Sequence, residues 1–156
     1  MTASKRGDAV ESVFREEGAA IWRALVGATG DMDVASEARA EAFAQALARG
    51  DAITNPAAWI WTASFSIAKG MLRDRTLDSR LEPPDPTHLP EPVRDLVDAL
   101  ASLPPKQRFA IVMHDYADRP TDEIAEALGC SRATVHVHLS AGRRRLRPLL
   151  QGDLHA

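Results

Sequence analysis

The sequence predicts an all-α protein built from two small helical domains joined by a proline-rich linker. Apolar residues recur at three- and four-residue steps on both sides of the middle of the chain, as on helices that bury one face. Five of the 10 prolines fall at positions 83–92, where they exclude a continuous helix. A hydrophobic content of 45% with only 5% aromatic residues suits compact helical units rather than disorder.

The first domain, residues 8–80, is predicted to contain three helices. The first covers residues near 8–28 and the second residues near 33–48. The third begins with Asn55 as its N-cap and Pro56 at the first helical position, which proline favours. The side chains expected to face the core are Val10, Val13, Phe14, Ile21 and Leu25, then Val34, Ala38, Phe43, Ala46 and Leu47, then Ile60, Ala63, Ile67 and Met71.

The linker is assigned to residues 81–92 and is expected to be extended and semi-rigid. The second domain, residues 93–151, is predicted to contain four helices. The first of these ends at Pro104 and Pro105, because proline disfavours continuation of a helix. The core-facing side chains of the first two helices are expected to be Val93, Leu96, Val97, Leu100 and Leu103, then Phe109, Val112, Met113 and Tyr116.

The last two helices, within Thr121–Arg147, are separated by a tight turn. Gly129 suits the left-handed backbone that ends a helix, and Ser131 is a good N-cap for the helix that follows. One seam on this last helix is expected to be buried and consists of Val135, Leu139, Gly142, Leu146, Leu149 and Leu150. The pattern is typical of a helix-turn-helix, whose second helix enters the major groove of DNA.

The charge distribution favours a polyanionic partner for the last helix. Residues 132–156 contain five arginines and a single acidic residue, whereas residues 82–131 contain four basic and ten acidic residues. The overall net charge of -3 therefore conceals a C-terminal segment of +4. The alternative is an ordinary amphipathic helix pair with a solvated basic face. Turn residues, capping and charge agree better with DNA binding.

Other features of the sequence argue against catalysis, cofactors and metals. The single cysteine, Cys130, excludes an internal disulfide and a multi-cysteine zinc site. His136 and His138 point about 200° apart on a helix, too far to share a metal ion on one face. His114 and Asp115 form a dipeptide without a further histidine cluster. We therefore expect no enzymatic activity, no cofactor, no metal and no small-molecule substrate.

No targeting or membrane-spanning segment is expected. The sequence has no run of 18 apolar residues, and its first residues lack the apolar core of a signal peptide. The prediction is a cytoplasmic protein without direct membrane insertion.

Several short motifs resemble region 4 of sigma-70-type RNA polymerase sigma factors, in the extracytoplasmic-function group. Residues 103–150 contain these motifs, which are Leu103-Pro104, Glu123-Ile124-Ala125, Leu128-Gly129, Thr134-Val135 and Arg143-Arg144-Arg145-Leu146. The first domain is similar to region 2 of the same family. The resemblance covers nearly the whole chain and implies a sigma region 2-like three-helix unit followed by a sigma region 4 helix-turn-helix unit.

The resemblance implies two contacts with promoter DNA. At the minus-35 element, polar side chains read base edges and arginines neutralise phosphates. The residues assigned to this contact are Ser131, Arg132, Thr134, His136, Val137, Ser140, Arg143, Arg144 and Arg147. At the minus-10 element, aromatic rings stack on separated bases beside cationic side chains. The residues assigned there are Asn55, Trp59, Trp61, Phe65, Ser66, Lys69 and Arg73.

The resemblance also implies core RNA polymerase as a partner, bound by the second helix, and an anti-sigma factor as a regulator. The polymerase-binding residues are expected to be Asp33, Glu37, Arg39 and Glu41. The family's acidic pair and glutamine on this helix are replaced by Ser36, Glu37 and Ala40. On the third helix, Phe65, Ser66 and Gly70 replace a common arginine-asparagine pair and aspartate.

Two other functions remain open from the sequence. One is a stand-alone helix-turn-helix regulator that binds duplex operators without polymerase. The other is a sigma-like decoy that occupies an anti-sigma factor without starting transcription. The acidic, aromatic-bearing first domain favours the sigma factor, because a repressor would more naturally have a ligand pocket or a dimerisation helix there.

Overall fold

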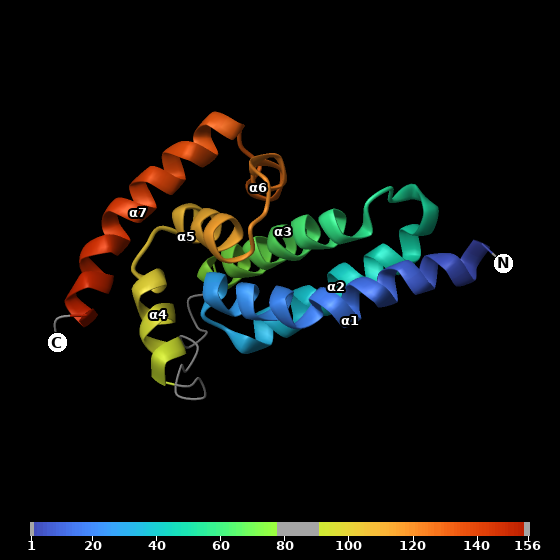
Figure 1. Cartoon of the computed structure of the whole chain (residues 1–156), viewed down its shortest axis with the longest axis horizontal. Coiled ribbons are helices and arrows are strands. Elements are labelled where there is room, and N and C mark those ends of the chain that lie inside the picture. The colour runs from blue at the N-terminus through green and yellow to red at the C-terminus, as the bar shows by residue number, and fades with distance from the viewer. Residues whose placement is uncertain (1, 78–90, 155–156) are drawn as a thin grey trace.

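The computed structural model describes the backbone of residues 2–77 and 91–154, and the side chains of residues 7–75 and 94–150. All regular elements in these ranges are helical, so the predicted all-α fold is confirmed. The first half consists of α1 (Thr2–Thr29), α2 (Met32–Arg49), the short 3₁₀ helix η1 (Gly50–Ala52) and α3 (Pro56–Leu77). The three long helices run side by side (Figure 1). No described helix is long and apolar enough to cross a membrane.

The predicted starts of the second and third helices are confirmed by their caps, whereas α1 begins at Thr2, earlier than the start predicted near residue 8. The Asp31 carboxylate accepts hydrogen bonds from the backbone N–H groups of Asp33 (2.9 Å) and Val34 (3.1 Å) at the start of α2. The Asn55 side-chain oxygen accepts one from the Ala58 N–H at 3.2 Å. Short polar side chains therefore set where α2 and α3 begin.

The second half consists of α4 (Glu91–Ala101), α5 (Pro105–Ile111), α6 (Thr121–Leu128) and α7 (Arg132–Leu154), as predicted in number and order. Residues 81–90 of the expected linker lie outside the described residues. Its assignment was wrong at the C-terminal end, because α4 already begins at Glu91. Pro92 lies in the first turn of α4, where its missing N–H removes no helical hydrogen bond.

A π-helical turn, η3 (Val112–Tyr116), extends α5 and was not predicted. The Ala117 N–H donates to the Val112 carbonyl at 3.0 Å, which closes the wider five-residue ring. After it, Asp118 adopts a left-handed backbone with φ of 54°. Apolar spacing does not distinguish such a turn from the α-helix that leads into it.

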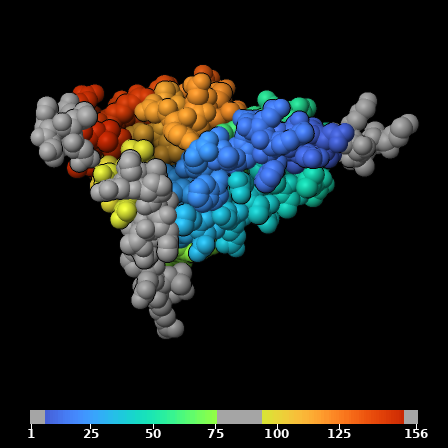
Figure 2. Space-filling view, turned by 60° about the horizontal axis from the view of Figure 1, so that its bottom comes forward, coloured from blue at the N-terminus to red at the C-terminus, as the bar shows by residue number. Residues whose placement is uncertain are grey.

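The two halves share one hydrophobic core. The Phe65 ring of α3 meets the Phe109 ring of α5 edge-on at 5.8 Å between centroids, and both side chains are buried. On the other side, Gly27 of α1 lies against Leu100 and Val112, where an added Cβ would lie 3.8 Å from each. Figure 2 shows the orange segment that contains η3 directly against α1 on the visible face.

Most of the predicted core residues are buried, but some are not. Ala63, Ile67 and Met71 are only half-buried, because α3 turns Trp61, Ser64 and Phe65 inward instead. The Phe14 side chain is 52% exposed and packs at the surface, edge-on against Phe43. The remaining predicted core residues that are exposed are Leu47, Leu96, Tyr116, Leu149 and Leu150.

Candidate nucleic-acid interface

The turn between α6 and α7 has the backbone expected of a helix-turn-helix. Gly129 ends α6 with φ of 68°, and the Cys130 N–H donates to the Ala125 carbonyl at 3.0 Å. The Ser131 hydroxyl then accepts from the Thr134 N–H at 3.1 Å and caps α7. The predicted roles of Gly129 and Ser131 are therefore confirmed.

Gly142 sets how closely α7 packs on α5. A Cβ built on Gly142 would lie 2.5 Å from Ile111 Cδ1 and 3.3 Å from Gln107 Cβ. Because the two helices touch at this point, the seam of α7 formed by Val135, Leu139 and Leu146 is buried. The opposite face of α7 is left to solvent.

The residues predicted to contact the minus-35 element lie almost entirely on this solvent face. Thr134 is half-buried, and its hydroxyl lies 2.8 Å from the Ser131 hydroxyl. The exposed residues of the set are Ser131, Arg132, His136, Val137, Ser140, Arg143, Arg144 and Arg147. Their contact with DNA stays a prediction, and their exposure leaves it physically open.

Two of these arginines face carboxylates within the protein. Arg132 Nε lies 3.0 Å from Asp122 Oδ1 across the turn. The Arg132 side chain is 73% exposed and the Asp122 side chain 72%. Arg143 Nη2 lies 2.6 Å from Asp115 Oδ1, and its Nε lies 3.3 Å from Asp115 Oδ2. The second pair uses two parallel hydrogen bonds and is the more constrained of the two.

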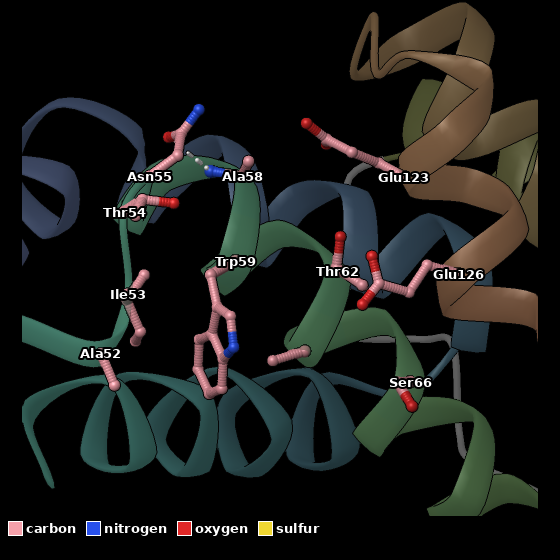
Figure 3. A pocket seen from close by; sticks show the side chains of 11 residues that line it. Ala52, Ile53, Thr54, Asn55, Ala58, Trp59, Thr62, Ser66, Glu123 and Glu126 are labelled. Atoms are coloured by element: carbon pink, nitrogen blue, oxygen red, sulfur yellow. Dashed lines mark hydrogen bonds between the residues drawn. The ribbon is translucent and has the colours of Figure 1, made fainter. Parts of the chain in front are cut away.

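The residues predicted to contact the minus-10 element divide into two groups on α3. Asn55, Ser66 and Arg73 are exposed, and Trp59 is half-buried with the Arg49 guanidinium 5.2 Å from its ring centre. A groove of about 490 Å³ runs along this side of α3 (Figure 3). Its lining includes Asn55, Trp59, Thr62 and Ser66.

The groove is closed at one end by α6. Glu123 and Glu126 project from α6 toward α3, as Figure 3 shows. The Glu123 carboxylate accepts two hydrogen bonds from Arg119, at 2.8 and 2.9 Å. At this end of the groove, the Glu126 carboxylate opposes the approach of a phosphate backbone while the two halves are packed together, whereas Arg119 neutralises the carboxylate of Glu123.

The rings of Trp61 and Phe65, predicted to stack on DNA bases, are buried in this arrangement of the chain, so their contact with DNA stays a prediction. Trp61 is 3% exposed and Phe65 is 0% exposed. Trp61 Nε1 donates to Glu17 at 3.0 Å, and the Arg119 guanidinium covers its ring at 5.3 Å. Both rings are buried because α3 lies between α1 and α2 on one side and α5 and α6 on the other.

Lys69, also assigned to the minus-10 contact, joins the two halves. Its Nζ donates to the Leu128 carbonyl at the C-terminus of α6, at 2.9 Å. It also lines a groove of about 690 Å³ with Arg73, Lys106 and His138. Burial, and then Lys106 and Arg73, lower the pKa of Lys69, while burial and Lys106 lower the pKa of His138.

The residues predicted to bind polymerase lie on α2, where Asp33, Glu37 and Glu41 are exposed. Arg39 differs from this expectation. Its Nη1 donates to the Gly18 carbonyl at 2.9 Å, and its guanidinium lies 5.5 Å from the centre of the Phe14 ring. Arg39 thus joins α2 to α1.

Sequence reasoning missed the polar contacts between the halves. Arg108 Nε donates to the Ala28 carbonyl at 2.5 Å, and Arg23 Nε donates to the Tyr116 hydroxyl at 3.0 Å. These residues lie 80 and 93 positions apart, so no local pattern pairs them. The side chains of residues 7–75 and 94–150 include no group of three or more His, Cys, Asp or Glu placed to hold a metal ion.

Comparisons with known proteins agree with this geometry. The family model described as Sigma-70, region 4 matches residues 93–146. The RNA polymerase sigma-E factor of Streptomyces antibioticus is 36% identical over 74 residues, which are 47% of this chain. The aligned part spans 40% of the length of that curated relative.

Two solved structures share the fold over most of the chain. One is the sigma factor RpoE in complex with the anti-sigma factor NepR from Bartonella quintana. Its TM-score is 0.74 at 20% sequence identity, and the match covers 90% of this chain and 96% of that one. The other is CnrH in complex with the cytosolic domain of CnrY, with a TM-score of 0.71 and 19% identity over 97% and 94%. Residues 93–146 therefore match the sigma-70 region 4 family model, and the chain as a whole shares the fold of the solved RpoE structure.

Proposed function

We propose that this protein is a sigma factor that binds core RNA polymerase and directs promoter-specific initiation of transcription. The observation that carries the proposal is the exposed, arginine-rich face of α7, most of which lies within the segment matched by sigma-70 region 4. The same helix buries its other face against α5 and α6, as a recognition helix must.

At the minus-35 element, α7 enters the major groove. Arg132, His136 and Ser140 lie in its first three turns and reach base edges, and they supply sequence choice. Arg144 and Arg147 lie further along the helix and neutralise phosphates. The N-terminal turns of α7 thus choose the sequence, and its later turns fix the position of the protein on the duplex through phosphates.

At the minus-10 element, α3 binds a separated strand after the two halves move apart. While they are packed, Trp61 and Phe65 are buried, and Glu123 and Glu126 lie at the groove beside Trp59. Opening exposes the rings for stacking and removes the carboxylates from the path of the backbone. Lys69 and Arg73 then supply cations on the same helix.

Two protein partners complete the proposal. The exposed carboxylates of Asp33, Glu37 and Glu41 on α2 contact core polymerase. An anti-sigma factor regulates the protein, by analogy with the RpoE–NepR complex of similar fold. The proposed place of action is the cytoplasm, where promoter DNA and polymerase are found, and the proposal includes no catalytic step.

Reconstitution with core RNA polymerase tests the proposal directly. We expect the full chain to co-elute with core polymerase and to give run-off transcripts from a library of promoter fragments. Core polymerase without the protein is the negative control for transcription. An Arg144→Ala, Arg147→Ala double variant is expected to associate with polymerase but to initiate poorly. A wild-type chain that neither associates nor initiates contradicts the proposal.

A second function, the sigma-like decoy, is favoured by one observation on α2. The Ser36 hydroxyl accepts from Trp22 Nε1 at 2.9 Å, and Arg39 is held against Gly18 and Phe14. These contacts engage two positions of the predicted polymerase-binding helix with α1. Association with polymerase without initiation indicates the decoy. Specific duplex binding without polymerase association indicates the stand-alone regulator.

A further inference from the structure

The two paired arginines of α7 are held with different strength. The Arg132–Asp122 pair has one close contact, at 3.0 Å, between side chains that are 73% and 72% exposed. The Arg143–Asp115 pair has two parallel contacts, at 2.6 and 3.3 Å, between side chains that are 44% and 42% exposed. A single exposed ion pair opens readily in water, whereas a bidentate one on an arginine is stronger and fixed in direction.

His114 adds a third member to the second pair. Its Nδ1 lies 2.7 Å from Asp115 Oδ1 and 3.2 Å from Arg143 Nη2. One nitrogen does not donate to the carboxylate and accept from the guanidinium at once. The shorter contact favours the tautomer in which Nδ1 donates to Asp115. The carboxylate of Asp115 is then bonded from both sides.

The packing of the helices keeps this cluster together. Asp115 and His114 belong to the π-helical turn η3, whose wider ring is closed by the Ala117 N–H. Gly142, the neighbour of Arg143, packs flush against Ile111, the neighbour of η3. The backbone on both sides of the pair is therefore fixed by contacts that do not involve the pair itself.

The position of Arg143 on α7 suits a phosphate rather than a base. It lies eleven residues after Arg132, or about 16 Å along the helix axis, beyond the turns that reach base edges. Its neighbours Arg144, Arg145 and Arg147 are exposed, and no described residue forms an ion pair with them. Among these four arginines, only Arg143 has its charge neutralised by a carboxylate of the described residues.

We propose that Asp115 withholds Arg143 from the DNA backbone and thereby sets the strength and salt dependence of duplex binding by α7. The inference rests on the proposed function, since it assumes that α7 binds DNA. A neutralised arginine releases no counterion from a phosphate, so α7 makes one phosphate contact fewer than its arginines allow. Asp115 is a determinant of affinity that itself touches no nucleotide.

The ionisation of the pair agrees with this role. Burial alone raises the pKa of Asp115, but hydrogen bonds from Arg143 and His114 outweigh it and lower the pKa below the usual value. The hydrogen bond with Asp115 raises the pKa of Arg143. Both groups therefore stay charged at neutral pH, and the pair persists where DNA binding is measured.

The test measures binding of the full chain to a non-specific duplex at several salt concentrations, with fluorescence anisotropy as the readout. Asp115→Asn is expected to free Arg143 and to steepen the log-log salt slope by about 0.9. By the same counterion relation, affinity at 0.1 M salt rises about eightfold. Asp115→Glu keeps the charge and is expected to stay close to the wild-type slope.

Asp122→Asn is the matched control. It also removes one carboxylate that faces an arginine of α7, but from a single, exposed contact. Its slope is expected to stay near that of the wild type, because Arg132 is already free to exchange partners. Arg143→Ala is expected to leave the wild-type salt slope unchanged. The Asp115→Asn, Arg143→Ala double variant is expected to lose the steeper slope of the Asp115→Asn single variant.

Three results overturn the inference. One is the same slope for Asp115→Asn and Asp122→Asn. Another is a flatter slope for Arg143→Ala than for the wild type, which shows that Arg143 already contacts DNA. The third is weaker binding by Asp115→Asn with an unchanged circular dichroism spectrum. A folded wild-type chain that binds no duplex at all contradicts the proposed function instead, which is a separate outcome.

Discussion

Both α3 and α7 are predicted from the sequence to face DNA, yet only α7 leaves its predicted face exposed. The difference lies in how many layers each helix touches. α7 packs on one side, against α5 and α6 with a smaller contact to α4, whereas α3 contacts α1 and α2 on one side and α6 on the other. A helix with one covered face shows its binding residues directly. A helix covered on two sides shows them only after part of the fold moves away.

The largest effect is expected where α3 is covered on both sides. Phe65→Ala removes a side chain that is 0% exposed and packed against Phe109 and Trp61. We expect a loss of about 3–5 kcal/mol in the free energy of unfolding, measured by urea denaturation. Val137→Ala on the exposed face of α7 is the control, with an expected change within about 0.5 kcal/mol. Similar changes for both variants contradict the burial of α3.

Two glycines test the packing of the same two helices in opposite directions. Gly70→Ala in α3 meets no atom within 4 Å and is expected to stabilise the protein by about 1 kcal/mol through helix propensity. Gly142→Ala in α7 places a Cβ 2.5 Å from Ile111 Cδ1 and is expected to destabilise it by about 1–2 kcal/mol. Thermal denaturation of the two variants and the wild type measures both changes in stability. Stabilisation by both substitutions excludes the close approach of α7 to α5.

The exposed arginines of α7 are expected to act on DNA binding rather than on stability. Arg144→Ala removes one phosphate contact and lowers the log-log salt slope of duplex binding by about 0.9. An unchanged slope removes Arg144 from the DNA contact. His136→Ala is expected to alter sequence preference instead, so selection from a random library should return a different minus-35 motif. The same motif from both proteins argues against base readout by His136.

The smallest effect concerns pH. Asp115 has a folded-state pKa below its unfolded value, so its contribution to stability is present above the unfolded pKa and is lost as pH falls through the folded one. The pair is 44% and 42% exposed, so screening by water keeps this contribution below about 1 kcal/mol. Urea midpoints from pH 6 down to pH 3 should fall less for Asp115→Asn than for the wild type. Equal pH dependence contradicts the pairing.

Local features of this fold are predictable from the sequence, and long-range ones are not. The caps at Asn55 and Ser131 and the helix end at Gly129 depend on neighbouring residues, so short patterns reveal them. The burial of Trp61 and Phe65 depends on a layer more than 40 residues away in sequence, which contributes Phe109 and Arg119. Periodicity identifies an apolar face, but it does not say how many neighbours cover the helix.

The same limit applies to the candidate interface. The exposed set on α7 is predictable, because charge and helical spacing both mark it. The partner of Arg143 is not, since Asp115 lies 28 residues earlier and reaches the arginine through a π-helical turn. Lys69 illustrates the point in α3, where a cation that suits DNA instead binds the Leu128 carbonyl.

If the protein acts as proposed, the core shared by the two halves makes promoter binding and folding compete for the same side chains. In the proposed function, only molecules with separated halves bind the minus-10 strand through Trp61 and Phe65. The apparent dissociation constant is then the intrinsic one divided by the fraction of open molecules. Each 1.4 kcal/mol that favours closure weakens the observed affinity about tenfold. In the proposed function, the affinity for promoter DNA is therefore governed partly by residues, such as Phe109, that do not touch DNA.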